Sequence, residues 1–118
     1  MKNMSMQLQH TSISKKAFKK KLLSGKKKII LEFYTDWSGG SYLVDRFLQK
    51  LALKYENRID IFRINADKDK SLSATYLIKR FPTLLLTHEG EVVDIIKGIQ
   101  PIENIEERID HFLNYDND

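Results

Sequence analysis

The segment that most constrains the fold is residues 29–34, Ile-Ile-Leu-Glu-Phe-Tyr, which is apolar at almost every position and rich in β-forming residues. Because successive side chains of a strand point to opposite faces, such a strand must be covered on both faces, as in the centre of an α/β sheet. Residues 59–65 have the same character. A helical stretch separates the two segments, so we expect parallel strands joined by a right-handed crossover.

Helical periodicity appears in the segments between and after these strands. After a turn at residues 36–41, apolar residues recur at helical spacing as far as about Tyr55, and a second such pattern covers residues 102–113, with Pro101 as its first residue. The other predicted elements are an edge strand at 6–10, a helix from Ser12 or Ser14 to Gly25, a short helix at 71–77, and an antiparallel hairpin of strands 83–87 and 92–96 turning at Glu89-Gly90. The resulting order, β-α-β-α-β-α-β-β-α, predicts an α/β protein with helices on both faces of its sheet.

The composition fits one domain over residues 1–118, with its core at 5–113 and a frayed tail at 114–118. The chain is 42% apolar and contains no cysteine, so it has neither disulfides nor thiolate ligands. We expect no metal and no other cofactor, since no cluster of histidines has metal-ligand spacing. The net charge of +4 comes from eight lysines at residues 15–28. This run contains no arginine and only Phe18 as an aromatic, so it predicts a solvated helix face and no nucleic-acid site.

The N-terminal ten residues contain no apolar stretch of the kind found in signal peptides. No apolar run along the chain is long enough to cross a bilayer. We therefore expect a monomeric cytoplasmic protein without membrane contact.

Two segments of the chain carry a resemblance to a known family. Residues 31–41, Leu-Glu-Phe-Tyr-Thr-Asp-Trp-Ser-Gly-Gly-Ser, resemble the thioredoxin active-site segment, in which a buried strand ends in Trp-Cys-Gly-Pro-Cys and opens a helix. Phe81-Pro82-Thr83 resembles the cis-proline segment of the same family, and Gly90, Gly98 and residues 63–67 also match it. The resemblance implies a thioredoxin fold, with a central mixed sheet of about five strands flanked by about four helices on both faces.

The resemblance places the family's two redox cysteines at Ser38 and Ser41. Thioredoxin chemistry needs one thiolate that attacks a disulfide and a second thiol that resolves the mixed disulfide, and a hydroxyl can do neither. The proline between the cysteines is replaced by Gly40, and the family's helix-kinking proline by Arg46. Two explanations remain open: the chain has diverged naturally, or both cysteines were replaced in this version of the sequence.

Glu32 is a carboxylate inside a buried strand. In the family, an acidic residue at this position relays protons to the buried cysteine. Without thiols this relay has nothing to deprotonate. We therefore expect a structural ion pair with Arg63 on the neighbouring strand, where the family usually has a lysine.

The remaining candidate positions form the substrate groove in the family. They are Trp37, Gly39, Gly40, Phe81, Pro82, Thr83, Gly98 and Ile99. We expect this groove to bind an extended peptide or a partner protein, because main-chain pairing beside the proline needs no cysteine. The alternatives are a protein-disulfide oxidoreductase with cysteines at positions 38 and 41, and a structural subunit held by one obligate partner.

Overall fold

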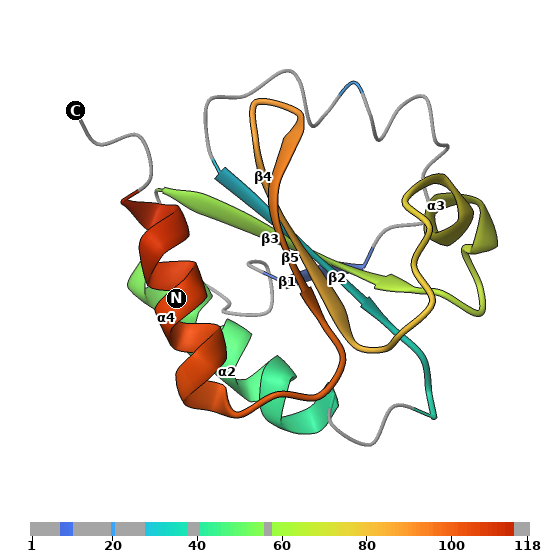
Figure 1. The fold of residues 1–118 in the computed structure, drawn as a ribbon, viewed down its shortest axis with the longest axis horizontal. Helices are drawn as coiled ribbons and strands as arrows, with labels where there is room; N and C mark the ends of the chain where they lie inside the picture. Colours follow the sequence, from blue (N-terminus) through green and yellow to red (C-terminus); the bar gives the residue numbers. More distant parts are fainter. Residues whose placement is uncertain (1–7, 11–19, 21–27, 38–40, 56–57, 115–118) are drawn as a thin grey trace, which may run out of the picture.

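The computed structural model describes residues 8–10, 20, 28–37, 41–55 and 58–114. Their strands form one five-stranded sheet (Figure 1). The strands are β1 (Leu8–His10), β2 (Lys28–Tyr34), β3 (Ile59–Asn65), β4 (Thr83–His88) and β5 (Glu91–Lys97), in the spatial order β1-β3-β2-β4-β5. β2 and β3 are parallel and β4 and β5 are antiparallel, as predicted, and the mixed sheet arises because β4 runs antiparallel to β2. β1 lies at the edge, parallel to β3.

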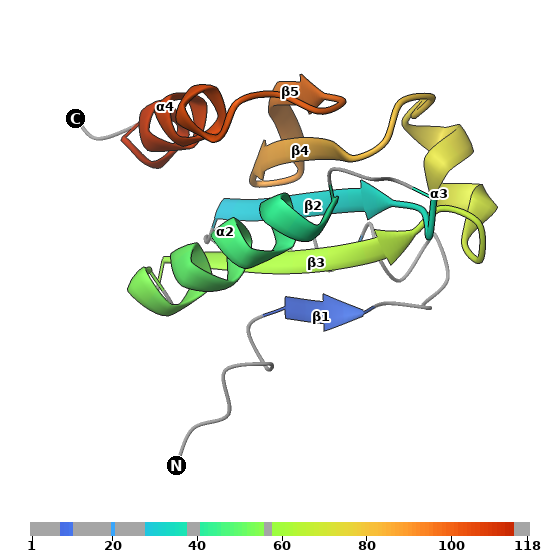
Figure 2. The ribbon, with the colours of Figure 1, turned by 90° about the horizontal axis from the view of Figure 1, so that it is seen from below.

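Three helices lie within the described residues: α2 (Ser41–Lys54), α3 (Lys70–Thr75) and α4 (Ile102–Leu113). α2 and α4 lie together on one face of the sheet, and α3 lies beyond the carboxyl ends of β2 and β3 (Figures 1 and 2). One apolar cluster joins α2 and α4 to the sheet through residues such as Leu48, Leu86 and Ile109. A second cluster on the opposite face contains Leu72 of α3 together with Leu31 and Phe33 of β2. Both faces of β2 are therefore buried, as its sequence predicts.

The structure refines some predicted boundaries. Three predicted segments lie outside the described residues. They are residues 12–19 and 21–25 of the predicted first helix, residues 6–7 of the predicted edge strand and residues 115–118 of the predicted tail. Pro101 was predicted as the first residue of the last helix, but it stands one position ahead, as the N-cap, with an extended ψ of 142°. The Glu89-Gly90 turn forms as expected, with positive φ at both residues, the geometry that a two-residue hairpin requires.

Lys28 is a buried cation that holds the end of α4 against the sheet. Its Nζ donates hydrogen bonds to the carbonyl oxygens of Phe112 and Leu113, at 2.7 and 3.0 Å. Arg58 donates a further bond to Leu113 O at 3.0 Å. The last carbonyls of a helix have no partner inside it, and the helix dipole makes them attractive to cations. Lys28 at the start of β2 and Arg58 just before β3 therefore supply hydrogen bonds to the carbonyl oxygens at the C-terminus of α4.

Replacing Lys28 with methionine is expected to lower the free energy of unfolding by about 2 kcal/mol, since the Phe112 carbonyl loses its charged donor and the Leu113 carbonyl keeps only Arg58. Urea denaturation followed by circular dichroism measures this loss. Lys50→Met on the exposed side of α2 is the matched control, and we expect it to change stability by less than about 0.5 kcal/mol. Equal losses in the two variants would contradict the role given to Lys28.

Candidate functional site

The positions that match the family's redox pair lie between the end of β2 and the first residue of α2. Ser41 is the first residue of α2, while Ser38, Gly39 and Gly40 lie outside the described residues. Trp37, the last described residue before them, is 88% exposed. Phe33 of β2 pairs with Thr83 of β4, so the turn after β2 begins beside the start of β4.

Pro82, Thr83 and Gly98 are brought together by the pairing of β4 with β5. The Phe81–Pro82 peptide bond is cis, and Pro82 is buried. The Gly98 N–H donates to the Pro82 carbonyl at 2.7 Å, immediately beyond the pairing of Thr83 with Lys97. Gly98 has a φ of 74°, the left-handed conformation that glycine adopts without steric cost. The chain can therefore turn away from the sheet directly after this hydrogen bond.

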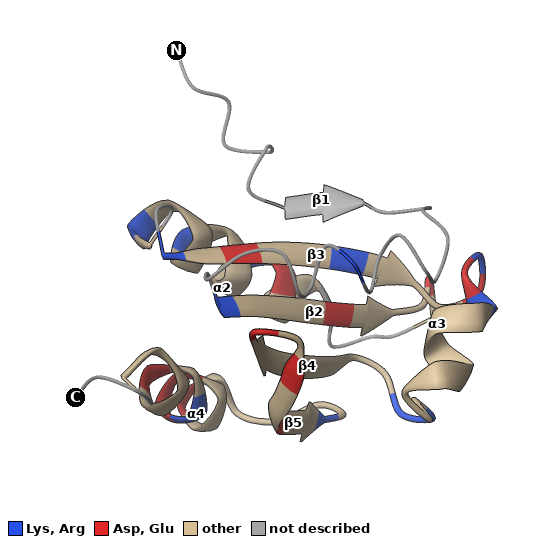
Figure 3. Cartoon of the chain, turned by 90° about the horizontal axis from the view of Figure 1, so that it is seen from above, with Lys and Arg blue, Asp and Glu red and all other residues tan. Residues whose placement is uncertain are grey.

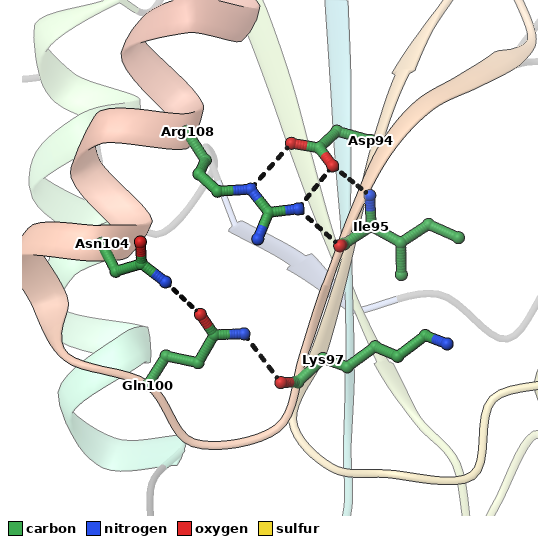
Figure 4. Close-up of polar contacts among 6 residues, drawn as sticks. All are labelled: Asp94, Ile95, Lys97, Gln100, Asn104 and Arg108. Carbon is green, nitrogen blue, oxygen red and sulfur yellow. Dashed lines mark hydrogen bonds and ion pairs between the residues drawn. The ribbon is translucent and has the colours of Figure 1, made fainter.

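The segment after Gly98 is anchored to α4 (Figure 4). The Gln100 side chain donates to the Lys97 carbonyl at 2.9 Å and accepts a hydrogen bond from Asn104. Gly98 and Ile99 thus lie in a short loop that is tied down at both ends. Ile99 projects from this loop and is 68% exposed.

An ion pair between α4 and β5 reinforces this anchoring (Figure 4). Arg108 binds both carboxylate oxygens of Asp94, at 3.1 and 2.6 Å, and donates to the Ile95 carbonyl at 2.9 Å. Partial burial raises the pKa of Asp94, but hydrogen bonds from Arg108 and from the Ile95 N–H outweigh it, so the pKa lies below its ordinary value. The carboxylate therefore stays charged at neutral pH, and the ion pair keeps α4 beside β5.

Phe81 has a backbone that is free to pair with another chain. Among the described residues, neither its N–H nor its carbonyl has a hydrogen-bonding partner. Its side chain is half-buried against the cluster that contains Leu72. A backbone donor and a backbone acceptor that have no partner in the described part of the chain are groups to which a peptide strand can add.

Glu32 forms the predicted ion pair with Arg63, and the structure adds Asp45 of α2 to it. Arg63 Nε lies 2.9 Å from Glu32 Oε1, and Arg63 Nη2 lies 2.9 Å from Asp45 Oδ2. The guanidinium also stacks on Tyr34, 4.0 Å from the ring centroid. Glu32 is fully buried, and one oxygen of each carboxyl, Glu32 Oε2 and Asp45 Oδ1, is buried without a donor. One cation therefore serves two carboxyl groups.

Two carboxyl groups beside one arginine retain a proton between them. Burial first, and then the hydrogen bond and negative charge of Asp45, raise the pKa of Glu32 to about 9, against the opposing effect of Arg63. With Asp45 ionised and Glu32 protonated, the cluster is neutral. A neutral cluster loses less hydration free energy on burial than a charged one.

The retained proton makes stability depend on pH. Between about pH 4.5 and 9, Glu32 is protonated in the folded chain and ionised in the unfolded chain, so the free energy of unfolding should fall as pH rises through this window. The slope can approach about 1.4 kcal/mol per pH unit. Urea denaturation at pH 5.5, 7 and 8.5 measures it. Glu32→Gln removes the titrating group, so its free energy of unfolding should change much less with pH. An equal change with pH in the two proteins would contradict the assignment to Glu32.

The sequence analysis missed Asp45, although a signal for it was present. Asp45 precedes Leu48 by three positions and Ala52 by seven, so it lies on the helix stripe that packs against the sheet. A carboxylate on a buried stripe requires a partner. Which cation serves it depends on how α2 crosses β3, and that crossing is a tertiary feature.

The strand order, the β4–β5 hairpin beside α4 and the proline at the start of β4 place the chain in the class of thioredoxin-fold proteins. The family model for thioredoxin matches residues 9–111. The chain belongs to the thioredoxin family.

Curated relatives support the same family. The chain is 34% identical over 96 residues to a thioredoxin of Staphylococcus epidermidis (strain ATCC 35984), covering 81% of this chain and 90% of that protein. It is 33% identical over 84 residues to a thioredoxin of Staphylococcus aureus (strain Mu50), covering 71% of this chain and 81% of that protein. These alignments cover most of each protein, so the similarity includes the domain as a whole.

Metal ligands and membrane-spanning helices are two further features that a chain of this size could carry. No group of three or more histidine, aspartate or glutamate side chains there could hold a metal ion. None of the helices in that part has the length and apolar character needed to cross a membrane.

Proposed function

We propose that this chain binds an extended peptide segment of a partner protein in the groove beside Pro82, without redox chemistry. The observation that carries the proposal is the free backbone of Phe81, next to a loop that presents Ile99. Main-chain pairing at Phe81 would supply affinity, and the exposed Trp37 and Ile99 would supply apolar contacts. The proposal also takes the protein to be a cytoplasmic monomer that binds neither nucleic acid nor membranes.

The absence of cysteine supports a binding role over a catalytic one. A serine hydroxyl cannot form a disulfide, and it is a weak nucleophile without an adjacent base. The groups around Pro82 that would bind a peptide include no thiol, so the cysteine-free chain retains all of them.

A fluorescein-labelled insulin B chain with carboxymethylated thiols tests the proposal, because an isolated chain can adopt an extended conformation on binding and its blocked thiols cannot form disulfides. We expect saturable binding by fluorescence anisotropy, weakened about tenfold by Ile99→Asp or Trp37→Ala, as for residues that anchor an interface. Leu53→Ala on α2 is the matched control, since Leu53 is also exposed but lies on another element. Absence of binding, or equal affinity in all variants, would overturn the proposal.

A second candidate is a protein-disulfide oxidoreductase in which residues 38 and 41 are cysteines in the natural protein. The relatives named thioredoxin favour it. In this candidate, residue 38 would be the nucleophile, residue 41 the resolving thiol and Glu32 the proton relay. Sequencing codons 38 and 41 in the source genome separates the two candidates directly.

A further inference from the structure

A hollow lies next to the proposed peptide groove. Its volume is about 560 Å³, and it is bounded by the connection from α3 to β4 and by the end of β5. It shares Arg80, Thr83 and Lys97 with the surroundings of Pro82. Thr83 Oγ1 donates to the Arg80 carbonyl at 2.6 Å, which fixes the chain just before Phe81. A peptide that pairs with Phe81 would therefore continue over this hollow.

The charge of the hollow has one sign. Lys79, Arg80 and Lys97 line it, all three are exposed, and none of its lining residues is acidic. Figure 3 shows basic residues on the connection after α3 and at the end of β5. The hollow between α2 and α4 differs, because acidic residues of α4 and the lysines Lys50 and Lys54 of α2 line it together. Only the hollow beside Pro82 therefore has charges of a single sign in this comparison.

An apolar side chain stands at the mouth of the cationic hollow under backbone strain. Leu77 has a φ of 56°, a left-handed conformation that is unfavourable for a residue with a β-carbon. Hydrogen bonds from the Leu77 N–H to Ala74 O and from the Ile78 N–H to Ser73 O hold it there, at 3.2 and 2.9 Å. The Leu77 side chain is nevertheless 78% exposed, and Ile95 of the same hollow is 38% exposed. Glycine would suit this turn better, so the leucine is not explained by the turn itself.

We infer that the partner peptide is acidic, with carboxylates that face Lys79, Arg80 and Lys97 and an apolar residue that packs on Leu77. This inference rests on the proposed function, because it extends the same bound peptide from Phe81 over the hollow. Three cations without a neighbouring carboxylate among the lining residues attract acidic side chains and repel basic ones. The exposed Leu77 and Ile95 require the acidic residues to be interspersed with apolar ones.

Two fluorescein-labelled peptides with the same core, Val-Thr-Val-Ala-Val, test this inference: one carries three glutamates on each flank and the other three lysines. We expect the acidic peptide to bind about tenfold more tightly in 50 mM salt, because each exposed ion pair contributes little alone. The preference should shrink in 500 mM salt. Changing Lys79, Arg80 and Lys97 to glutamate should reverse the preference for the acidic peptide. Leu77→Gly should weaken the binding of both peptides while keeping the fold.

The matched control changes Lys50 and Lys54 of α2 to glutamate, which alters net charge away from the groove and should leave the preference in place. If both peptides bind equally, and Ile99→Asp weakens both, the peptide groove stands and the acidic specificity is wrong. If neither peptide binds, and the insulin B chain does not bind either, the proposed function itself fails. A reversed preference in the control variant would assign the selectivity to net charge and overturn the inference.

Discussion

Replacing Arg63 with methionine is expected to destabilise the fold by about 3 kcal/mol at pH 7, because the buried Glu32 carboxyl and the partly buried Asp45 carboxylate both lose their charged hydrogen-bond donor. Glu32 is fully buried, and the Arg63 side chain is only 15% exposed, so water cannot replace the lost partner. The stacking of the guanidinium on Tyr34 is lost as well. Urea denaturation at pH 7 measures the effect.

Arg46→Met is the matched control for this variant. Arg46 also contacts an aromatic ring, that of Tyr42, but both side chains are exposed, and we expect a loss below about 1 kcal/mol. Adding Glu32→Gln and Asp45→Asn to Arg63→Met should recover part of the stability, since the uncompensated charge is then gone. If Arg63→Met costs no more than Arg46→Met, the buried cluster does not stabilise the fold.

Introducing cysteine at positions 38 and 41 is expected to convert an inert chain into an active one in insulin reduction with dithiothreitol. The unaltered chain contains no thiol, so it should not exceed the dithiothreitol background. The double variant supplies an attacking thiolate at position 38 and a resolving thiol at position 41, the first residue of α2, and we expect about a tenfold or larger gain over that background. Turbidity of the precipitating B chain measures the rate.

Ser38→Cys alone is the control for this gain. A single thiol can attack a disulfide but cannot resolve the mixed disulfide, so turnover should stay near background. If the double variant is also inert, the scaffold has lost redox competence and the binding role gains support. Activity in the unaltered chain would contradict the claim that this sequence lacks dithiol chemistry.

The surroundings of Pro82 were predictable in outline because their parts are carried by short sequence segments. Phe81-Pro82-Thr83 and Gly98 lie where the resemblance places them, and Gly98 meets Pro82 through one hydrogen bond. The cationic hollow beside the groove was not predicted. Lys79 and Arg80 lie on a loop and Lys97 at the end of β5, and only the pairing of β4 with β5 brings them together.

The amino-acid sequence by itself determined the layered α/β fold, because strands that are apolar on both faces must be covered by helices, and helical periodicity showed where those helices lie. It also determined the pairing of Glu32 with Arg63, since parallel neighbouring strands place them opposite each other. Only the tertiary structure decided that Asp45 joins this pair and that Lys28 completes α4. Both contacts depend on how a helix crosses the sheet, and that crossing is set by the packing of the whole core, which no local pattern encodes.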